Sequence, residues 1–420
     1  DARPEGDGKT NAKLKLIAGL LGVGFDALRQ REQQRRQRRL LAITAASLVG
    51  MLLTGALAVT AWLARQDAER RREQAEDLIG FMLGDLTRNL RAIGRLDVFD
   101  AIGDKALDYF AALREQDLTE RTIAQRADAL TLIGETAIDR ADLEDAVRAF
   151  RESVEQARKL VQREPDHPDW QRQLADSELW LGYAYWQQGE LDQALDNVRL
   201  SLAAAERSLA LRPGDPSLLR TQANAHNNIA HVRERRGELD DARQEYETVL
   251  ELQHRMVQAR PDDPDLKAEL GFAYNNLGKV LLQLGELAAA RRYYERDLEI
   301  KRSLLAAEPA HRLWQRYLAI SENHMGRLLE LLGDTSGAAR NVEAALALSE
   351  QLADEDPDNA PRLRFLASVL TQAGRLARMA GDFTLASARQ RRAVEMLESL
   401  VAREPANVDF RSSLAEAQLA

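Results

Sequence analysis

The feature that most constrains the fold of this chain is an internal repeat with a period of about 48 residues. Prolines and small residues recur with the same step, and turn glycines and alanines form two further series. The repeated prolines are Pro165, Pro213, Pro261, Pro309, Pro357 and Pro405, and the small residues are Gly134, Gly182, Ala230, Gly278, Gly326 and Gly374. A fixed period of about 20–50 residues indicates a solenoid, a propeller or an array.

Each period reads as two helices joined by a tight turn. In one period the first helix is expected from Trp170 to Gln188 and the second from Leu191 to Leu211. Gly189 separates them, because glycine accepts the left-handed conformation that ends a helix. Proline and aspartate then punctuate the return, as in REPDHPD and ARPDDPD. The sequence therefore predicts an all-α fold, a solenoid of helix-turn-helix repeats.

Composition agrees with helices and removes several classes of function. The chain has 45% hydrophobic but only 5% aromatic residues, with charges of both signs interspersed. Its net charge of -9 argues against nucleic acid as a partner. It has no cysteine, so disulfides and thiolate metal sites are excluded.

The repeated unit resembles the tetratricopeptide repeat (TPR). Leu181-Gly182-x-x-Tyr185 matches the Leu-Gly core of the family's first helix. Ala290 with Tyr294 matches the Ala-x-x-x-aromatic pattern of its second helix, and Pro261 matches its closing proline. The family's common unit has about 34 residues, so both helices should be longer here. The resemblance covers six units over 117–404, with 405–420 as a partial repeat or cap.

In TPR folds the first helices line a concave surface that often binds peptides, and this resemblance directs attention to three columns of residues. They occupy the positions three and two before the Leu-Gly glycine and the position just after it. The candidate ligand-groove residues are Trp180, Asn227, Asn228, His231, Asn275, Asn276, Lys279, Asn323, His324, Arg327 and Arg375.

Asparagine can hold a peptide backbone through both its donor and its acceptor. The Lys and Arg residues would favour an acidic segment or a C-terminal carboxylate. The partner expected from this face is therefore a protein or a peptide, with an acidic one preferred. The alternative is that these residues are solvated helix faces with hydrogen bonds between repeats. The oligomeric state is left open, a homo-oligomer included.

A second feature is the uncharged stretch 40–64, which Arg39 and Arg65 flank. As a helix it would measure about 37 Å, enough to cross a hydrocarbon core of about 30 Å. Trp62 stands near one end, where interfacial aromatic residues belong. We expect a transmembrane helix in contact with the lipid bilayer. A cleaved signal or a buried soluble helix is the alternative.

Arginine counts on the two flanks predict the orientation of this span. More arginines precede Leu40 than follow Ala64, and basic residues favour the cytoplasmic side. The preceding ones are Arg29, Arg31, Arg35, Arg36, Arg38 and Arg39, and the following ones are Arg65, Arg70, Arg71 and Arg72. The expected protein is a single-pass protein of the bacterial inner membrane, with residues 1–39 in the cytoplasm and the repeats outside it. Residues 65–116 read as juxtamembrane helices that cap the first repeat.

The N-terminal tail reads as one amphipathic helix. Leu14, Ile17, Leu20 and Leu21 form an apolar face. The segment resembles the last helix of a bacterial Toll/interleukin receptor (TIR) domain, and the layout resembles the C-terminal part of bacterial TIR receptor-like chains. The resemblance implies an upstream effector domain, since the chain begins at Asp1. The alternative is a helix that lies on the membrane surface.

Signals for an enzyme are weak. The segment GDGKT at 6–10 lacks the first glycine of a P-loop, because Arg3 stands there. The six histidines are scattered, and no nucleophile motif is present. We therefore expect no catalysis and no cofactor. Three functions stay open: the sensor part of a receptor, a static envelope scaffold, and the regulatory part of a TIR enzyme that cleaves NAD.

Overall fold

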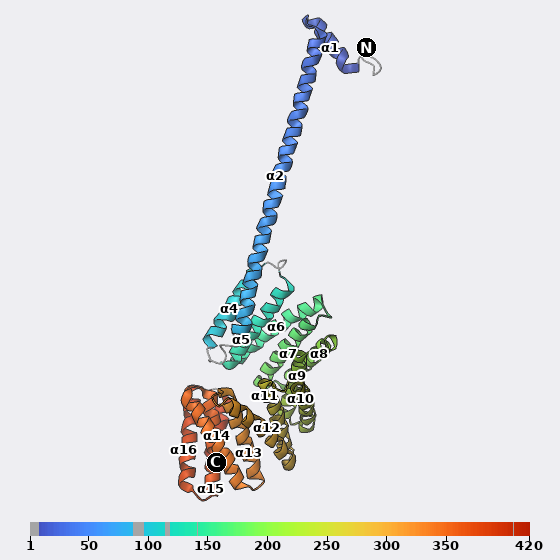
Figure 1. Cartoon of the computed structure of the whole chain (residues 1–420). Coiled ribbons are helices and arrows are strands. Elements are labelled where there is room, and N and C mark those ends of the chain that lie inside the picture. The colour runs from blue at the N-terminus through green and yellow to red at the C-terminus, as the bar shows by residue number, and fades with distance from the viewer. Residues whose placement is uncertain (1–7, 87–95, 114–117, 141, 406) are drawn as a thin grey trace. The chain divides into compact units, whose positions relative to one another are not determined.

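The computed structural model describes residues 8–86, 96–113, 118–140, 142–405 and 407–420 (Figure 1). The chain divides into two compact units, Asp1–Phe81 and Met82–Ala420. Each unit is helical throughout its described part.

The first unit holds two helices, α1 (Gly8–Leu21) and α2 (Phe25–Phe81). α2 is a continuous helix of 57 residues, so the apolar stretch 40–64 lies inside a longer helix. The large apolar side chains of this stretch are exposed; Leu52 and Met51, for example, are 72% and 71% exposed. On α1, Ile17 is half-buried while Leu20 is 81% exposed.

The second unit begins with a π-helical turn at Met82–Leu86 and continues as helices. They are α4 (Leu96–Ala111), α5 (Glu120–Asp139), α6 (Leu143–Arg163), α7 (Pro168–Gln188), α8 (Leu191–Leu211), α9 (Pro216–Arg235), α10 (Leu239–Ala259), α11 (Pro264–Gln283), α12 (Leu287–Ala307), α13 (Arg312–Leu331), α14 (Thr335–Glu355), α15 (Ala360–Met379), α16 (Phe383–Arg403) and α17 (Val408–Leu419).

From α5 onward the helices pair in chain order, and each pair packs on the next (Figure 1). The first helices are α5, α7, α9, α11, α13 and α15, and the second helices are α6, α8, α10, α12, α14 and α16. α4 packs on α5 through Ile102 and Leu132. The predicted TPR-like α-solenoid of helix-turn-helix repeats is confirmed.

Two kinds of glycine explain why the pairs form. Gly189 ends α7 with φ +84°, and Glu190 N donates to Tyr185 O at 2.9 Å across the turn. A side chain would be strained in that conformation. Gly278 instead lies where helices touch, because a Cβ there would stand 2.7 Å from the Tyr294 ring. Glycine at this position lets α11 and α12 approach closely.

The returns between repeats start the next first helix. Asp263 accepts a hydrogen bond from Leu266 N at 3.2 Å, which satisfies one free N–H at the start of α11. Pro264 occupies the first turn, where its fixed φ suits a helix and its missing N–H costs nothing. The repeated prolines such as Pro261 lie in the turn before a first helix, whereas Pro264 is the first residue of the helix itself.

Candidate binding face

The three columns predicted to bind a ligand lie on the first helices. They are carried by α7, α9, α11, α13 and α15, and we call the surface that these columns and their neighbours form the first-helix face. The structure divides the eleven candidate residues into three groups. Some line two hollows, some are paired across repeats, and two, Asn275 and Asn323, are buried.

The Trp180 hollow encloses about 380 Å³ and is lined only by first helices. Trp180, Asn227, Asn228 and His231 are predicted residues that it brings together. Its complete lining is Glu135, Ile138 and Asp139 of α5, Leu179, Trp180 and Tyr183 of α7, and Asn224, Asn227, Asn228 and His231 of α9. The hollow spans three successive repeats.

The Arg327 hollow shares some of its lining positions with the Trp180 hollow, three repeats later along the chain. It encloses about 420 Å³ between α13, α15, α16 and α17. Its lining is Arg327, Ser368, Thr371, Gln372, Arg375, Leu397, Ser413, Glu416, Ala417, Leu419 and Ala420. Arg327 stands in the column of Tyr183, and Arg375 stands in the column of His231. The same position in the solenoid therefore carries aromatic and amide groups at one end and guanidinium groups at the other.

Two predicted residues, Asn275 and Asn323, are buried, and His324 is half-buried. The two asparagines are each 5% exposed. Asn275 Nδ2 donates to Asp297 Oδ2 at 2.8 Å, and Asn275 Oδ1 accepts from His324 Nδ1 at 3.0 Å. Burial, and then the nearby positive charges, lower the pKa of His324 to about 3, so its ring is neutral. Asn275 and His324 thus hydrogen-bond to each other between the first helices of successive repeats.

Lys279 is already paired within the protein. Its Nζ lies 3.0 Å from Glu234 Oε1, and Gln283 Nε2 donates to the same oxygen at 2.6 Å. Tyr246 Oη donates to Glu234 Oε2 at 3.0 Å. Burial would raise the pKa of Glu234, but these partners and the His231 side chain outweigh it and lower the pKa to about 2. Glu234 is therefore an ionised carboxylate whose ion pair neutralises the charge of Lys279.

The same pairing recurs two repeats later, and its absence between them leaves one cation free. Arg375 Nε donates to Glu330 Oε1 at 2.7 Å, and its Nη2 donates to Oε2 at 3.0 Å. Glu234 and Glu330 stand at the same distance along the chain before their cations, and the corresponding position before Arg327 is Leu282. Arg327 is exposed and forms no ion pair within the described ranges of the chain.

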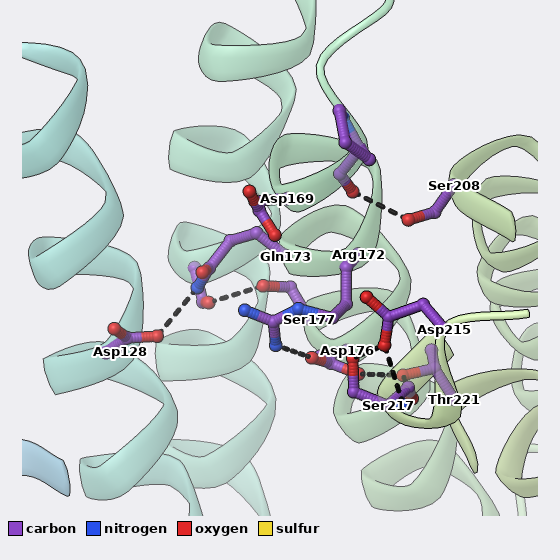
Figure 2. Close-up of polar contacts among 12 residues, drawn as sticks. Asp128, Asp169, Arg172, Gln173, Asp176, Ser177, Ser208, Asp215, Ser217 and Thr221 are labelled. Carbon is purple, nitrogen blue, oxygen red and sulfur yellow. Dashed lines mark hydrogen bonds and ion pairs between the residues drawn. The ribbon is translucent and has the colours of Figure 1, made fainter. Parts of the chain in front are cut away.

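A row of polar contacts joins the first helices of the early repeats, as Figure 2 shows. Gln173 Nε2 of α7 donates to Asp128 Oδ1 of α5 at 2.7 Å, and Thr221 Oγ1 of α9 donates to Asp176 Oδ1 of α7 at 3.5 Å. Burial raises the pKa of Asp176 to about 6; Arg172 opposes the shift, and the charge of Asp128 adds to it. The Asp176 side chain is nevertheless 40% exposed.

Asp128, Asp176, Glu135, Asp139, Glu234 and Glu330 belong to this face, and none of them was among the sequence candidates. A signal for some of them is present in the repeat. Asp128 and Asp176 are one period apart, and Glu234 and Glu330 are two periods apart. The signal becomes meaningful only when the columns of neighbouring helices are known to touch. Among the described residues, no group of three His, Asp or Glu side chains is arranged to hold a metal ion.

Comparisons with known proteins agree with the geometry. The tetratricopeptide repeat model matches residues 221–303. The apo form of RapI is similar at 12% identity and a TM-score of 0.52, over 77% of this chain and 77% of RapI. BtubC from P. vanneervenii is similar at 24% identity and a TM-score of 0.48, over 61% of this chain and 92% of BtubC.

The quorum sensor NprR from B. thuringiensis, also in its apo form, is similar at 15% identity and a TM-score of 0.48, over 84% of this chain and 94% of NprR. The RapI match supports the fold alone. No curated protein matches the chain. The fold is thus a TPR-like solenoid, a class that suggests a scaffold or a sensor for protein–protein interaction.

Proposed function

We propose that this chain is a membrane-anchored interaction module whose first-helix face binds an extended peptide segment of a partner protein. The observation that carries the proposal is the pair of hollows on that face that share lining columns, one around Trp180 and one around Arg327. Arg327 lacks the glutamate that pairs its neighbours Lys279 and Arg375, so its guanidinium is open to a carboxylate of a partner.

The helix α2 supports the membrane part of the proposal. Its apolar window is 0% buried, and its length and composition allow it to cross a bilayer. Side chains such as Leu52, at 72% exposure, would be unfavourable in water along so long a surface. Lipid would cover them. A signal sequence satisfies the same criteria, and it would be absent from the mature protein.

The arginine bias supports a topology with residues 1–39 in the cytoplasm and the repeats outside it. The assay is a pair of reporter fusions at Ala64 and Ala420 of the full chain in a bacterial host. Alkaline phosphatase should be active and green fluorescent protein dark at both positions. The opposite pattern would place the repeats in the cytoplasm, and a soluble, truncated product would favour a cleaved signal.

The partner is proposed to be acidic where it meets Arg327. The cations at 279 and 375 are neutralised by Glu234 and Glu330, which leaves the free guanidinium of Arg327 as the preferred contact for a carboxylate. Of the three basic residues Lys279, Arg327 and Arg375, only Arg327 is then expected to contact an acidic residue of the partner. Binding outside the cytoplasm would then be relayed to a cytoplasmic effector, for which a TIR-like domain remains the prediction.

Peptide display tests this function directly. Random dodecapeptides are selected on detergent-solubilised full chain, and the selected peptides are then measured by fluorescence anisotropy against variants. Arg327→Glu should weaken binding at least tenfold. Arg199→Glu is the matched control, because Arg199 is also exposed but lies on the second helix α8. Peptides that bind both variants equally would show that the first-helix face is not the binding surface.

A further inference from the structure

A basic segment of α2 precedes the apolar stretch 40–64. Residues 25–39 contain six arginines and only two acidic residues, Asp26 and Glu32, so the segment has a net charge of +4 in a chain whose net charge is -9. The segment after the apolar stretch, 65–81, contains four arginines and five acidic residues, a net charge of -1. Both segments belong to one unbroken helix (Figure 1). The two flanks of the apolar stretch therefore differ strongly in charge.

Four arginines of the first flank lie on one face of α2. They are Arg31, Arg35, Arg38 and Arg39, and we call them the arginine stripe. Their spacing of i, i+4, i+7 and i+8 places side chains on the same side of a helix. All four are exposed, and none forms an ion pair or a hydrogen bond with another side chain in the described part of the protein. Their guanidinium groups are therefore open to an anion from outside the chain.

The arginines of the second flank are compensated by carboxylates of the same helix. Arg65 Nε lies 3.0 Å from Glu69 Oε1, and Arg72 Nε lies 3.4 Å from Glu76 Oε1. The other acidic residues of this flank are Asp67, Glu73 and Asp77. An anion that approaches this flank would meet carboxylates among the arginines, and the attraction would be offset.

The position of the arginine stripe selects the anion that it can meet. Arg39 adjoins Leu40, and Arg31 lies about 12 Å farther along the helix at about 1.5 Å per residue. The headgroup layer of a bilayer is about 5–8 Å thick on each side of the hydrocarbon core. The attraction of anionic lipids extends about one Debye length, about 8 Å, beyond it. With 40–64 in the core, the whole stripe lies within this range of the headgroups.

We propose that the arginine stripe binds the phosphate groups of anionic phospholipids in the leaflet next to Leu40. A guanidinium suits this role, because two parallel N–H groups match two phosphate oxygens. The proposal rests on the membrane anchor of the proposed function, and it adds a class of lipid as a partner. Nucleic acid also carries phosphate groups, but the stripe continues directly into the apolar stretch, which places lipid headgroups beside it.

The absence of cysteine allows a single label at either flank. Gln37→Cys places a fluorescent donor beside the arginine stripe, and Ala68→Cys places it at the second flank; both positions are exposed. The full chain is reconstituted in phosphatidylcholine vesicles that contain a minority of phosphatidylglycerol. A trace of either lipid carries the acceptor on an acyl chain. Energy transfer from the Gln37→Cys label should be about twofold or more stronger to phosphatidylglycerol than to phosphatidylcholine, and about equal from the Ala68→Cys label.

Variants locate the effect. The first variant replaces three arginines of the stripe: Arg35→Gln, Arg38→Gln and Arg39→Gln. The matched control removes the same number of charges from the second flank: Arg65→Gln, Arg70→Gln and Arg71→Gln. The first variant should lose the lipid preference at the Gln37→Cys label, and the control should keep it. Higher salt should weaken the preference, because exposed charges are screened. Both leaflets hold the same lipids, so the result does not depend on topology.

The results separate this proposal from the proposed function. Equal transfer to the two lipids from the Gln37→Cys label would overturn the lipid site and leave the anchor intact, as would an equal loss of preference in the two triple variants. No transfer to either lipid from either label would show that α2 is not in the bilayer, and the membrane part of the proposed function would fail. A stripe without lipid preference that instead binds a short DNA duplex would identify nucleic acid as the partner and overturn the proposal.

Discussion

Replacing Asp297 by valine should destabilise the middle of the solenoid severely. Asp297 and Lys301 are 0% and 2% exposed, and Lys301 Nζ lies 2.8 Å from Asp297 Oδ1 on α12. Lys301 also donates to Ser321 Oγ at 2.8 Å and lies 4.5 Å from the centre of the Phe272 ring. Burial raises the pKa of Asp297 and lowers that of Lys301, and their mutual attraction opposes both shifts.

The magnitude follows from what the valine leaves behind. A buried ammonium without its carboxylate costs about 3–5 kcal/mol of unfolding free energy. The chain supplies the control, because the equivalent residues one repeat earlier are Val249 and Gln253, both buried. The double variant Asp297→Val with Lys301→Gln removes both charges and should recover most of this loss. A cost of about 1–3 kcal/mol should remain, because the buried Asn275 Nδ2 loses its acceptor.

Urea unfolding of the full chain in detergent, followed by circular dichroism, measures the loss. Because repeats can unfold separately, hydrogen exchange of peptides from α11, α12 and α13 should locate it. The pH gives a second readout. In the Asp297→Val variant the folded pKa of Lys301 lies below its unfolded value, so the unfolded state binds more protons and stability rises with pH. The gap to the double variant should therefore narrow between pH 7 and pH 9.5. Equal stability of the single and double variants at pH 7 would refute the reasoning.

Three further perturbations test the contacts of the solenoid. The pKa of Glu234 is lowered to about 2, so this carboxylate contributes stability above about pH 4.5 that is lost as the pH falls toward 2. Over this pH range the free energy of unfolding, followed by circular dichroism, should fall by on the order of 3 kcal/mol more in wild type than in Glu234→Gln. Gly278→Ala places a Cβ against the Tyr294 ring and should cost about 1–3 kcal/mol in urea unfolding, whereas Gly285→Ala, at φ +79° with open space around it, should cost about 1 kcal/mol. Arg375→Met should lower the free energy of unfolding by about 1 kcal/mol, because it leaves Glu330, which is 15% exposed, without its partner. Arg327→Met should change the free energy of unfolding by less than about 0.5 kcal/mol. Equal losses in the two variants would contradict the conclusion that Arg375 is paired and Arg327 is not.

The interior of the candidate face was the hardest part to predict. Asn275 and Asn323 stand in the columns that face ligands in TPR folds, yet both are buried here. For Asn275 the reason is Asp297, an acidic residue on the second helix where the other repeats carry Ser, Val or Ala. Its carboxylate needs donors from a neighbouring first helix, and Asn275 supplies one at 2.8 Å. A column of first-helix residues does not by itself show that a side chain of a second helix, such as Asp297, will accept a hydrogen bond from one of them.

The sequence by itself determined the helices, their pairing and their turns, because those depend on local chemistry that recurs in every repeat. A glycine that must adopt positive φ, as Gly189 does, and a proline in the first turn, as Pro264 is, act wherever they occur. Only the tertiary structure decided which charges on the first-helix face are free. Lys279 and Arg327 occupy the same column and are both basic, but only Lys279 has a glutamate, Glu234, at the pairing position of the preceding first helix. The corresponding position before Arg327 is Leu282. Whether the cation is paired depends on a residue of the preceding first helix. Only the packing of one repeat on the next brings that residue within ion-pair distance.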